Sequence, residues 1–387
     1  MADHIGQRIA ARRHARRMTQ ADLAREAHVS LPMVKAIERG ARNPGQTTLA
    51  GIASALGTDP SRLDPTYTGT GHRVRTALPV ISAAIAGYEI PLGDAPRRPL
   101  AELRSGIGAA VGWRLAAQYG LIATHVPALL TDSLAHLHAG GRAESARLLV
   151  AAARTADAVA YKYGAHDLSA RLIDVMRWAA VQADDADVAA TAAYVHAETF
   201  LAARAHRVGH VALERALDSA PPPGTARSAA GRGALHMRAA VVAARAGNAD
   251  AAHGHLREAR TLANGLTEGV YLGTAFGPSS VRIHEVSVAV SLGRDHIGDA
   301  LDVVSRWSPG DETPAERRSG FWIEVSRAQL WAGDPDGAFE SLKTARRHGP
   351  QHVREHPWVR ETIETIRRLK RAHAESLTHF AEWIGAV

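Results

Sequence analysis

The chain has 387 residues, and its 46 lysines and arginines outnumber its 39 acidic residues to give a formal net charge of +7. A chain of this length, with 46% hydrophobic residues, predicts two or three folded domains rather than one core. It contains no cysteine, which excludes disulfides, cysteine-ligated metal centres and a thiol nucleophile. Alanine, the best helix former, supplies about a fifth of the residues, so we predict an all-α protein.

The first sixty residues have the pattern of four short helices. The first contains Ile5 and Ile9 at helical spacing, and the next two cover residues 20–27 and 30–39. Thr19 and Ser30 stand where capping residues begin the second and third helices, and a fourth helix carries Leu49 and Leu56. Two short helices joined by a tight turn and flanked by packing helices predict a helix-turn-helix.

Residues 19–57, TQADLAREAHVSLPMVKAIERGARNPGQTTLAGIASALG, resemble the Cro/repressor-type (XRE) DNA-binding domain. The resemblance extends over residues 5–63 and implies that the helix over residues 30–39 enters the major groove. The base contacts that it implies are Leu31, Pro32, Lys35 and Ala36, and the backbone contacts are Thr19, Gln20, Ser30, Arg39, Arg42 and Asn43. The alternative is that these are solvated residues of a helical bundle. The arginines of the first helix fit either phosphate contacts or a solvated face.

The expected domain organisation follows from composition. Residues 1–65 form the DNA-binding domain, and a segment rich in proline and glycine over residues 66–99 is a linker with a connecting helix. Residues 100–387 form a TPR-like helical domain for ligand sensing and dimerisation. A single helix-turn-helix module buries little surface, so we expect a homodimer on pseudo-palindromic double-stranded DNA.

From residue 100 the chain repeats an apolar helix, a break at glycine or aspartate, and a second, alanine-containing helix. Five segments follow this plan: residues 127–160, 168–204, 235–263, 281–307 and 321–347. The last of them, broken at Gly333-Asp334, resembles the tetratricopeptide (TPR) pattern best. We predict an α-solenoid of TPR-like helix pairs, with a concave groove lined by the first helix of each pair. A compact helical bundle is the alternative.

The order of the two parts resembles the peptide-pheromone receptors of Gram-positive bacteria, which act in quorum sensing, and a group of actinobacterial regulators. Residues 276–293 (FGPSSVRIHEVSVAVSLG) and 356–369 (HPWVRETIETIRRL) resemble segments that recur in the actinobacterial group. Peptide-pheromone receptors typically hold the peptide backbone with asparagines, whereas this chain has only Asn43, Asn248 and Asn264. The resemblance therefore implies a peptide effector but leaves room for a small molecule.

Arginines beside tryptophan or histidine on the predicted groove helices are candidates for ligand binding, because they can hold a carboxylate or stack on an aromatic group. These candidates are Arg177, Trp178, Tyr194, His196, His236, Arg238, Arg282, His284 and Trp322. The alternative for each one is a core aromatic residue or a solvated arginine.

The 21 histidines do not predict a metal site. The pairs with one intervening residue point to different parts of a helix surface, and prolines interrupt the run with helical spacing; these are His136 and His138, His253 and His255, and His348, His352 and His356. Because no cysteine or carboxylate cluster joins them, we expect no metal and no cofactor. The chain also has no P-loop, no His-Glu-x-x-His and no Gly-x-Ser-x-Gly, so we expect no enzyme.

We therefore expect a cytoplasmic, sequence-specific transcription regulator whose TPR-like domain senses a small molecule or peptide and controls the operator binding of a dimer. No stretch of about 18 apolar residues and no secretory signal is present, so we expect no membrane association. Two alternatives remain: a DNA-localised scaffold whose solenoid binds a protein partner, and a ligand-independent repressor.

Overall fold

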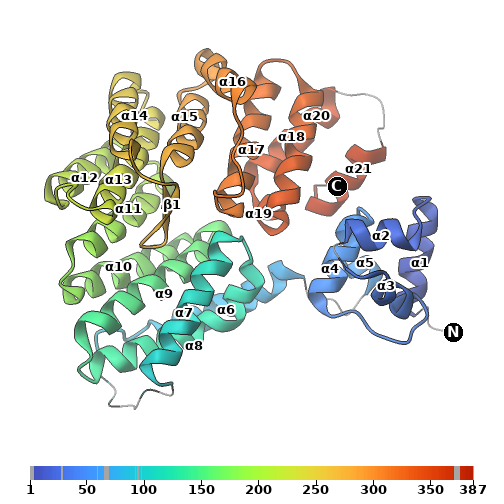
Figure 1. The fold of residues 1–387 in the computed structure, drawn as a ribbon, viewed down its shortest axis with the longest axis horizontal. Helices are drawn as coiled ribbons and strands as arrows, with labels where there is room; N and C mark the ends of the chain where they lie inside the picture. The colour runs from blue at the N-terminus through green and yellow to red at the C-terminus, as the bar shows by residue number, and fades with distance from the viewer. Residues whose placement is uncertain are drawn as a thin grey trace. The chain divides into compact units, whose positions relative to one another are not determined.

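The computed structural model describes residues 4–27, 29–58, 60–64, 69–91, 93, 96, 98–369 and 375–386. In these ranges the regular secondary structure is helical apart from one two-stranded hairpin (Figure 1). It divides into a first unit, Met1–His72 with Ile363–Val387, and a second unit, Arg73–Thr362. Residues 66–68, 92, 94, 95 and 97 of the predicted linker lie outside the described ranges, as does residue 65 before it. No helix of the described part is long and apolar enough to span a bilayer.

The first unit contains the four helices predicted from the sequence. They are α1 (Ile5–Ala15), α2 (Gln20–Glu26), α3 (Leu31–Glu38) and α4 (Gln46–Ala55), followed by a short α5 (Pro60–Leu63). The hydroxyl of Thr19 accepts the backbone N–H of Asp22 at the start of α2, and Ser30 caps α3 in the same way. Apolar side chains from all five helices, such as Ile9 and Ile37, are buried in one core.

A segment from the far end of the chain also belongs to the first unit. Helix α20 (Pro357–Leu369) crosses the boundary at residue 363, and α21 (Glu375–Ile384) lies wholly within this unit. Leu377 and Phe380 of α21 are buried, and Glu382 forms an ion pair of 3.3 Å with Arg62. Nothing in the sequence indicated that residues 363–387 belong to the same unit as residues 1–72.

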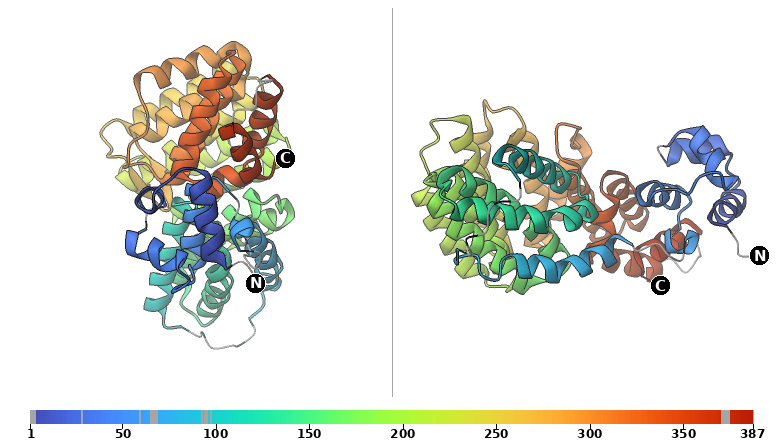
Figure 2. Two further views of the ribbon diagram at one scale, coloured as in Figure 1. Left: turned by 90° about the vertical axis from the view of Figure 1, so that its right-hand side faces the viewer. Right: turned by 90° about the horizontal axis from the view of Figure 1, so that it is seen from below.

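The second unit is the array of helix pairs that the sequence predicts, and all five predicted pairs are present (Figures 1 and 2). Its helices are α6 (Thr70–Ala84), α7 (Leu100–Leu115), α8 (Tyr119–His138), α9 (Arg142–Lys162), α10 (His166–Ala183), α11 (Ala186–Ala202), α12 (His206–Ser219), α13 (Ala226–Arg245), α14 (Ala249–Ala263), α15 (Pro278–Leu292), α16 (Ile297–Arg306), α17 (Ala315–Trp331), α18 (Pro335–His348) and α19 (Pro350–Glu355). A single 3₁₀ turn, Arg294–His296, precedes α16. Small side chains let these helices pack closely, and α13 buries a run of alanines and valines.

The array has an inner and an outer layer. The inner helices α7, α9, α11, α13, α15 and α17 each contact the next, and α17 also contacts α7, so that the inner layer closes into a ring. Helix α12, which the sequence analysis missed, pairs with α11. The prediction that the first helix of each pair lines the groove was wrong for the first two pairs. In these pairs the second helix, α9 or α11, is the inner one.

A β-hairpin between α14 and α15 was also not predicted. Strands β1 (Gly269–Tyr271) and β2 (Thr274–Phe276) are antiparallel, and the turn residues Leu272 and Gly273 have φ of 47° and 74°. Two positive φ values in a two-residue turn favour glycine and match the right-handed twist of a hairpin. The carbonyl of Gly273 accepts Arg114 of α7 at 2.6 Å, and that of Leu272 accepts Arg154 of α9 at 3.0 Å. The hairpin tip is thereby fixed to two inner helices.

Candidate functional site

The first candidate surface is the solvent side of α3 and the loop that follows it. Helix α3 turns Val34 and Ile37 into the core, so the remaining positions face outward. The side chains of Thr19, Ser30, Pro32, Lys35, Arg39, Arg42 and Asn43 are exposed, and those of Gln20, Leu31 and Ala36 are partly exposed. The structure therefore places all ten predicted DNA contacts at the surface of this unit.

A buried ion pair fixes α3 against α1. Arg13 of α1 donates to both carboxylate oxygens of Glu38, at 2.7 and 2.9 Å, and also donates to the carbonyl of Met18 at 2.8 Å. The side-chain amide of Gln20 donates to the same carboxylate at 2.7 Å. Burial alone would raise the pKa of Glu38, but the hydrogen bonds from Arg13 and Gln20 outweigh it and lower the pKa. Arg13 of α1 and Gln20 of α2 thus both bind the carboxylate of Glu38, so that this residue of α3 connects the three helices.

The second candidate site is a cavity of about 850 Å³ within the ring of inner helices. Its centre is Tyr194 of α11, whose hydroxyl accepts Arg317 of α17 at 2.7 Å. The guanidinium of Arg238 lies over the ring of Tyr194 at 4.3 Å, and that of Arg154 lies at 5.5 Å. Burial favours the neutral phenol, yet the three arginines outweigh it and lower the pKa of Tyr194 to about 8. Guanidinium groups from three helices therefore surround the side chain of Tyr194.

The positive charge of the cavity is only partly compensated. Glu198 pairs with Arg238 at 3.2 Å, and Glu316 pairs with Lys162 at 2.7 Å. Within the described ranges neither Arg114 nor Arg154 has a carboxylate partner, and both donate to the hairpin carbonyls instead.

Burial has a clear effect on the ionisable groups of this cavity. It lowers the pKa of Arg114, and it lowers the pKa of Arg154 to about 9. Burial and the nearby Glu198 raise the pKa of Asp157 well above its usual range. His284 is also buried, which lowers its pKa to about 3 and keeps it neutral. The excess charge in the cavity therefore comes from guanidinium groups.

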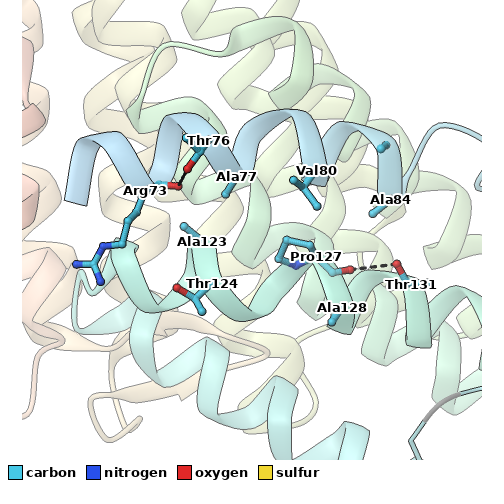
Figure 3. Close-up of a pocket in the computed structure, with 11 residues that line it drawn as sticks. Arg73, Thr76, Ala77, Val80, Ala84, Ala123, Thr124, Pro127, Ala128 and Thr131 are labelled. Carbon is cyan, nitrogen blue, oxygen red and sulfur yellow. Dashed lines mark hydrogen bonds between the residues drawn. The ribbon is translucent and has the colours of Figure 1, made fainter. Parts of the chain in front are cut away.

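A shallower groove of about 630 Å³ lies between α6 and α8 (Figure 3). Its lining is mainly small and apolar, with Ala77, Ala84, Ala123 and Pro127 facing the space. Its threonine hydroxyls are used locally, as in the hydrogen bond of 3.2 Å from Thr131 to the carbonyl of Pro127. No polar groups converge in it as they do around Tyr194.

Comparisons with known proteins agree with the geometry of the first unit. Residues 9–63 match a family model described as helix-turn-helix. The first unit carries an XRE-type helix-turn-helix domain. An immunity repressor protein of Bacillus phage phi105 is 45% identical to this chain over 53 residues, which are 14% of this chain. The match spans 37% of the length of that repressor.

The solved structure of Bacillus thuringiensis PlcR in complex with the peptide PapR7 and DNA covers 68% of this chain and 95% of PlcR. It matches this chain with 14% identity and a TM-score of 0.31.

In the helix-turn-helix domain four of the predicted backbone contacts already form intramolecular hydrogen bonds, namely Thr19, Gln20, Ser30 and Arg39. The hydroxyl of Thr19 donates to the carboxylate of Asp22 at 2.7 Å, so it is part of the cap of α2. Gln20 uses one amide N–H on Glu38. Arg39 donates its Nε–H to the carbonyl of Lys35 at 3.1 Å, and its terminal nitrogens lie at the surface.

Of the predicted groove residues, Tyr194, Arg238 and His284 line the cavity. The others lie elsewhere: Arg177 pairs with Asp174 on the outer helix α10, Trp178 packs on Tyr88 and His138, His196 on Phe200, His236 beside His255, Arg282 over Trp307 and Trp322 on Phe321. Residues two apart on a helix lie about 200° apart around its axis, so only one member of each such pair can face the cavity.

The sequence analysis missed Arg114, Arg154 and Arg317. Arg154 stands in a helix between Ala152-Ala153 and Thr155-Ala156, all of which are buried. An arginine within a run of small buried residues must be buried as well, and that signal in the sequence would have identified it.

Proposed function

We propose that this chain is a DNA-binding transcription regulator whose second unit binds an anionic ligand in the cavity around Tyr194. The observation that carries the proposal is the convergence of four arginines on one cavity: the buried Arg154 and the partly buried Arg114, Arg238 and Arg317. Within the described ranges Arg114 and Arg154 have no carboxylate partner, and a bound carboxylate or phosphate would supply one.

The DNA-binding half of the proposal rests on the helix-turn-helix domain. Helix α3 would lie in the major groove, where Lys35 is placed to reach O6 or N7 of a guanine. The exposed Arg39, Arg42 and Asn43 would hold the phosphate backbone. Because one such module contacts few base pairs, we propose that a homodimer binds a pseudo-palindromic operator.

The cavity indicates the class of ligand. Its volume of about 850 Å³ lies within the range of pockets that enclose small molecules, about 300–1,000 Å³. An arginine cluster that lowers the pKa of a buried tyrosine to about 8 also stabilises a bound anion. The ligand is therefore a small acid or a short peptide held by its carboxylate.

The hairpin offers a route by which ligand binding could alter the second unit. Arg114 and Arg154 donate to the carbonyls of Gly273 and Leu272 at the hairpin tip. A ligand anion that takes these donors competes with the hairpin, so occupancy of the cavity and position of the hairpin become linked. A ligand with different affinities for the two hairpin positions shifts their populations.

The test compares the wild type with Arg154→Met, which removes the charge and keeps much of the side-chain volume. In a thermal-shift screen of carboxylic acids, phosphate esters and short peptides, an acidic compound should raise the melting temperature of the wild type. The same compound should have little effect on Arg154→Met and full effect on Arg177→Met, a matched change on the outer helix α10. An acid that stabilises all three proteins equally would show that the cavity does not bind it.

A further inference from the structure

Three potential metal ligands converge on the outer side of the array, away from the cavity. His210 and Glu214 lie one turn apart on α12, so their side chains share a face of that helix. His255 of α14 meets them there. The Nε2 atoms of the two histidines are 3.2 Å apart, and Oε1 of Glu214 lies 3.0 Å from Nε2 of His255 and 3.7 Å from Nε2 of His210.

These three distances match the spacing of ligands around one ion. Zinc binds histidine nitrogen and carboxylate oxygen at about 2.0–2.2 Å, which places the corners of a tetrahedron about 3.3 Å apart. The three distances between the ligand atoms, 3.0, 3.2 and 3.7 Å, lie on both sides of that value. One ion could therefore bind all three atoms with only small side-chain adjustments.

Hydrogen bonds within the cluster cannot satisfy all three of these side-chain atoms at once. A neutral or protonated His255 has at most one hydrogen on Nε2, and that hydrogen cannot point at both Glu214 and His210. A cation at the centre of the triangle interacts with all three ligand atoms at once.

We propose that His210, Glu214 and His255 bind a divalent transition-metal ion, with zinc as the best match. Two histidines and one carboxylate are a ligand set that zinc uses when it keeps a fourth position open. The side chain of Glu214 is 47% exposed and that of His255 is 11% exposed, so the site opens to solvent on one side. A water molecule can occupy the fourth position from there.

His236 of α13 supports the site from behind. Its Nδ1 atom lies 3.1 Å from Nδ1 of His255, the ring nitrogen that points away from the proposed ion. A hydrogen bond at this second nitrogen fixes the orientation of a metal-bound imidazole. His236 is therefore a positioning residue, and the ion would tie α12 to α14 across the inner helix α13.

The sequence did not indicate this cluster, because its members come together only in the folded chain. The expectation of no metal considered histidines close in the sequence, such as His253 and His255. The cluster instead joins two helices that are far apart in the sequence, and the sequence analysis had not predicted α12.

The experiment titrates the metal-free full-length chain with Zn²⁺ by calorimetry, and with Co²⁺ by the visible absorption of a four-coordinate ion. We expect one high-affinity ion per chain in the wild type and in His253→Ala, a control on the same helix whose ring lies beside His296. Removal of a ligand in His255→Ala should weaken binding by at least about 100-fold, and loss of the supporting His236 in His236→Gln by about 10-fold.

Circular dichroism in chelator establishes that each variant is folded, and Glu214→Gln replaces His255→Ala if the latter does not fold. Equal Zn²⁺ affinity in the wild type and in the folded ligand variant would overturn the proposal, as would the absence of high-affinity binding by the wild type. Neither result bears on the anion cavity, since no residue of the cluster lines it.

Discussion

Lys35 is exposed on α3 and is one residue in this helix that can donate a hydrogen bond to a base edge. Its predicted neighbours at the DNA, Leu31, Pro32 and Ala36, can only make apolar contacts. We therefore predict that Lys35→Ala lowers the preference for the operator over other DNA by about 1–3 kcal/mol. Fluorescence anisotropy with operator and scrambled DNA measures this difference.

Arg42 provides the matched control for Lys35. It lies in the loop after α3, where a phosphate contact is expected, so Arg42→Ala should weaken binding to all sequences similarly and reduce the salt slope by about 1. If Lys35→Ala instead weakened operator and scrambled DNA equally, Lys35 would be a phosphate contact and not a base contact.

Glu38 is predicted to make the stability of the helix-turn-helix domain depend on pH. The folded state lowers its pKa below the ordinary 4.5, so its stabilising contribution is complete above that value. It is lost as the pH falls through the lower, folded-state pKa, because protonation breaks the pair with Arg13. Glu38→Gln leaves Arg13 buried without a charged partner and should cost about 3 kcal/mol at neutral pH.

Hydrogen exchange of α1 and α3 in the full chain measures this effect. Protection in the wild type should fall toward acid pH, whereas Glu38→Gln should have low protection at neutral pH and a weaker dependence on acid. Equal protection of both proteins at neutral pH would contradict the structural role of the pair.

Individual residues of the candidate site were harder to predict than the helices that carry them. The capping positions Thr19 and Ser30 are local signals, and the structure confirms both. The cavity arginines belong to four different helices, and nothing local in the sequence shows that they converge. A residue such as His284 could be placed on a helix, but its side of the helix depends on the packing of the neighbours.

At the scale of elements, the hairpin depends on one close approach. A Cβ atom at Gly233 of α13 would lie 1.9 Å from the ring of Phe276, which is fully buried at the end of β2. Gly233→Ala should therefore displace the ring and destabilise the second unit by about 1–3 kcal/mol. Gly231→Ala, two residues earlier on the same helix, meets no atom within 4 Å and should be neutral or slightly stabilising.

Denaturant unfolding of the two alanine variants measures this contrast. Destabilisation of both variants to the same extent would show that the effect comes from the helix and not from the contact with Phe276.

The same elements show where prediction from sequence failed. Helices with a clear apolar period and glycine or aspartate breaks were found, as for α13 with α14 and α17 with α18. The first two pairs were counted from α8 and not from α7, so their inner and outer helices were exchanged, and the missed helix α12 hid this shift from the later pairs. The signal for the hairpin is short, with only Val270-Tyr271 and Thr274 flanking its Leu-Gly turn.

At the scale of the whole molecule, the two proposed functions belong to separate units of one chain. The helix-turn-helix domain would read the operator, and the ring of inner helices would hold an acid whose presence alters that reading. Each function has its own residues, Lys35 in one unit and Arg154 in the other. A variant of either residue should therefore impair its own function and leave the other intact.

The most direct test is a DNA-binding measurement on sequences that the protein itself selects from random DNA. Binding is compared with scrambled DNA at two salt concentrations, with and without extract of the native culture, for the wild type and Arg154→Met. We predict specific binding by both proteins and a response to extract by the wild type alone. Specific binding that is indifferent to extract in both proteins, or that responds equally in both, would contradict control through the arginine cavity.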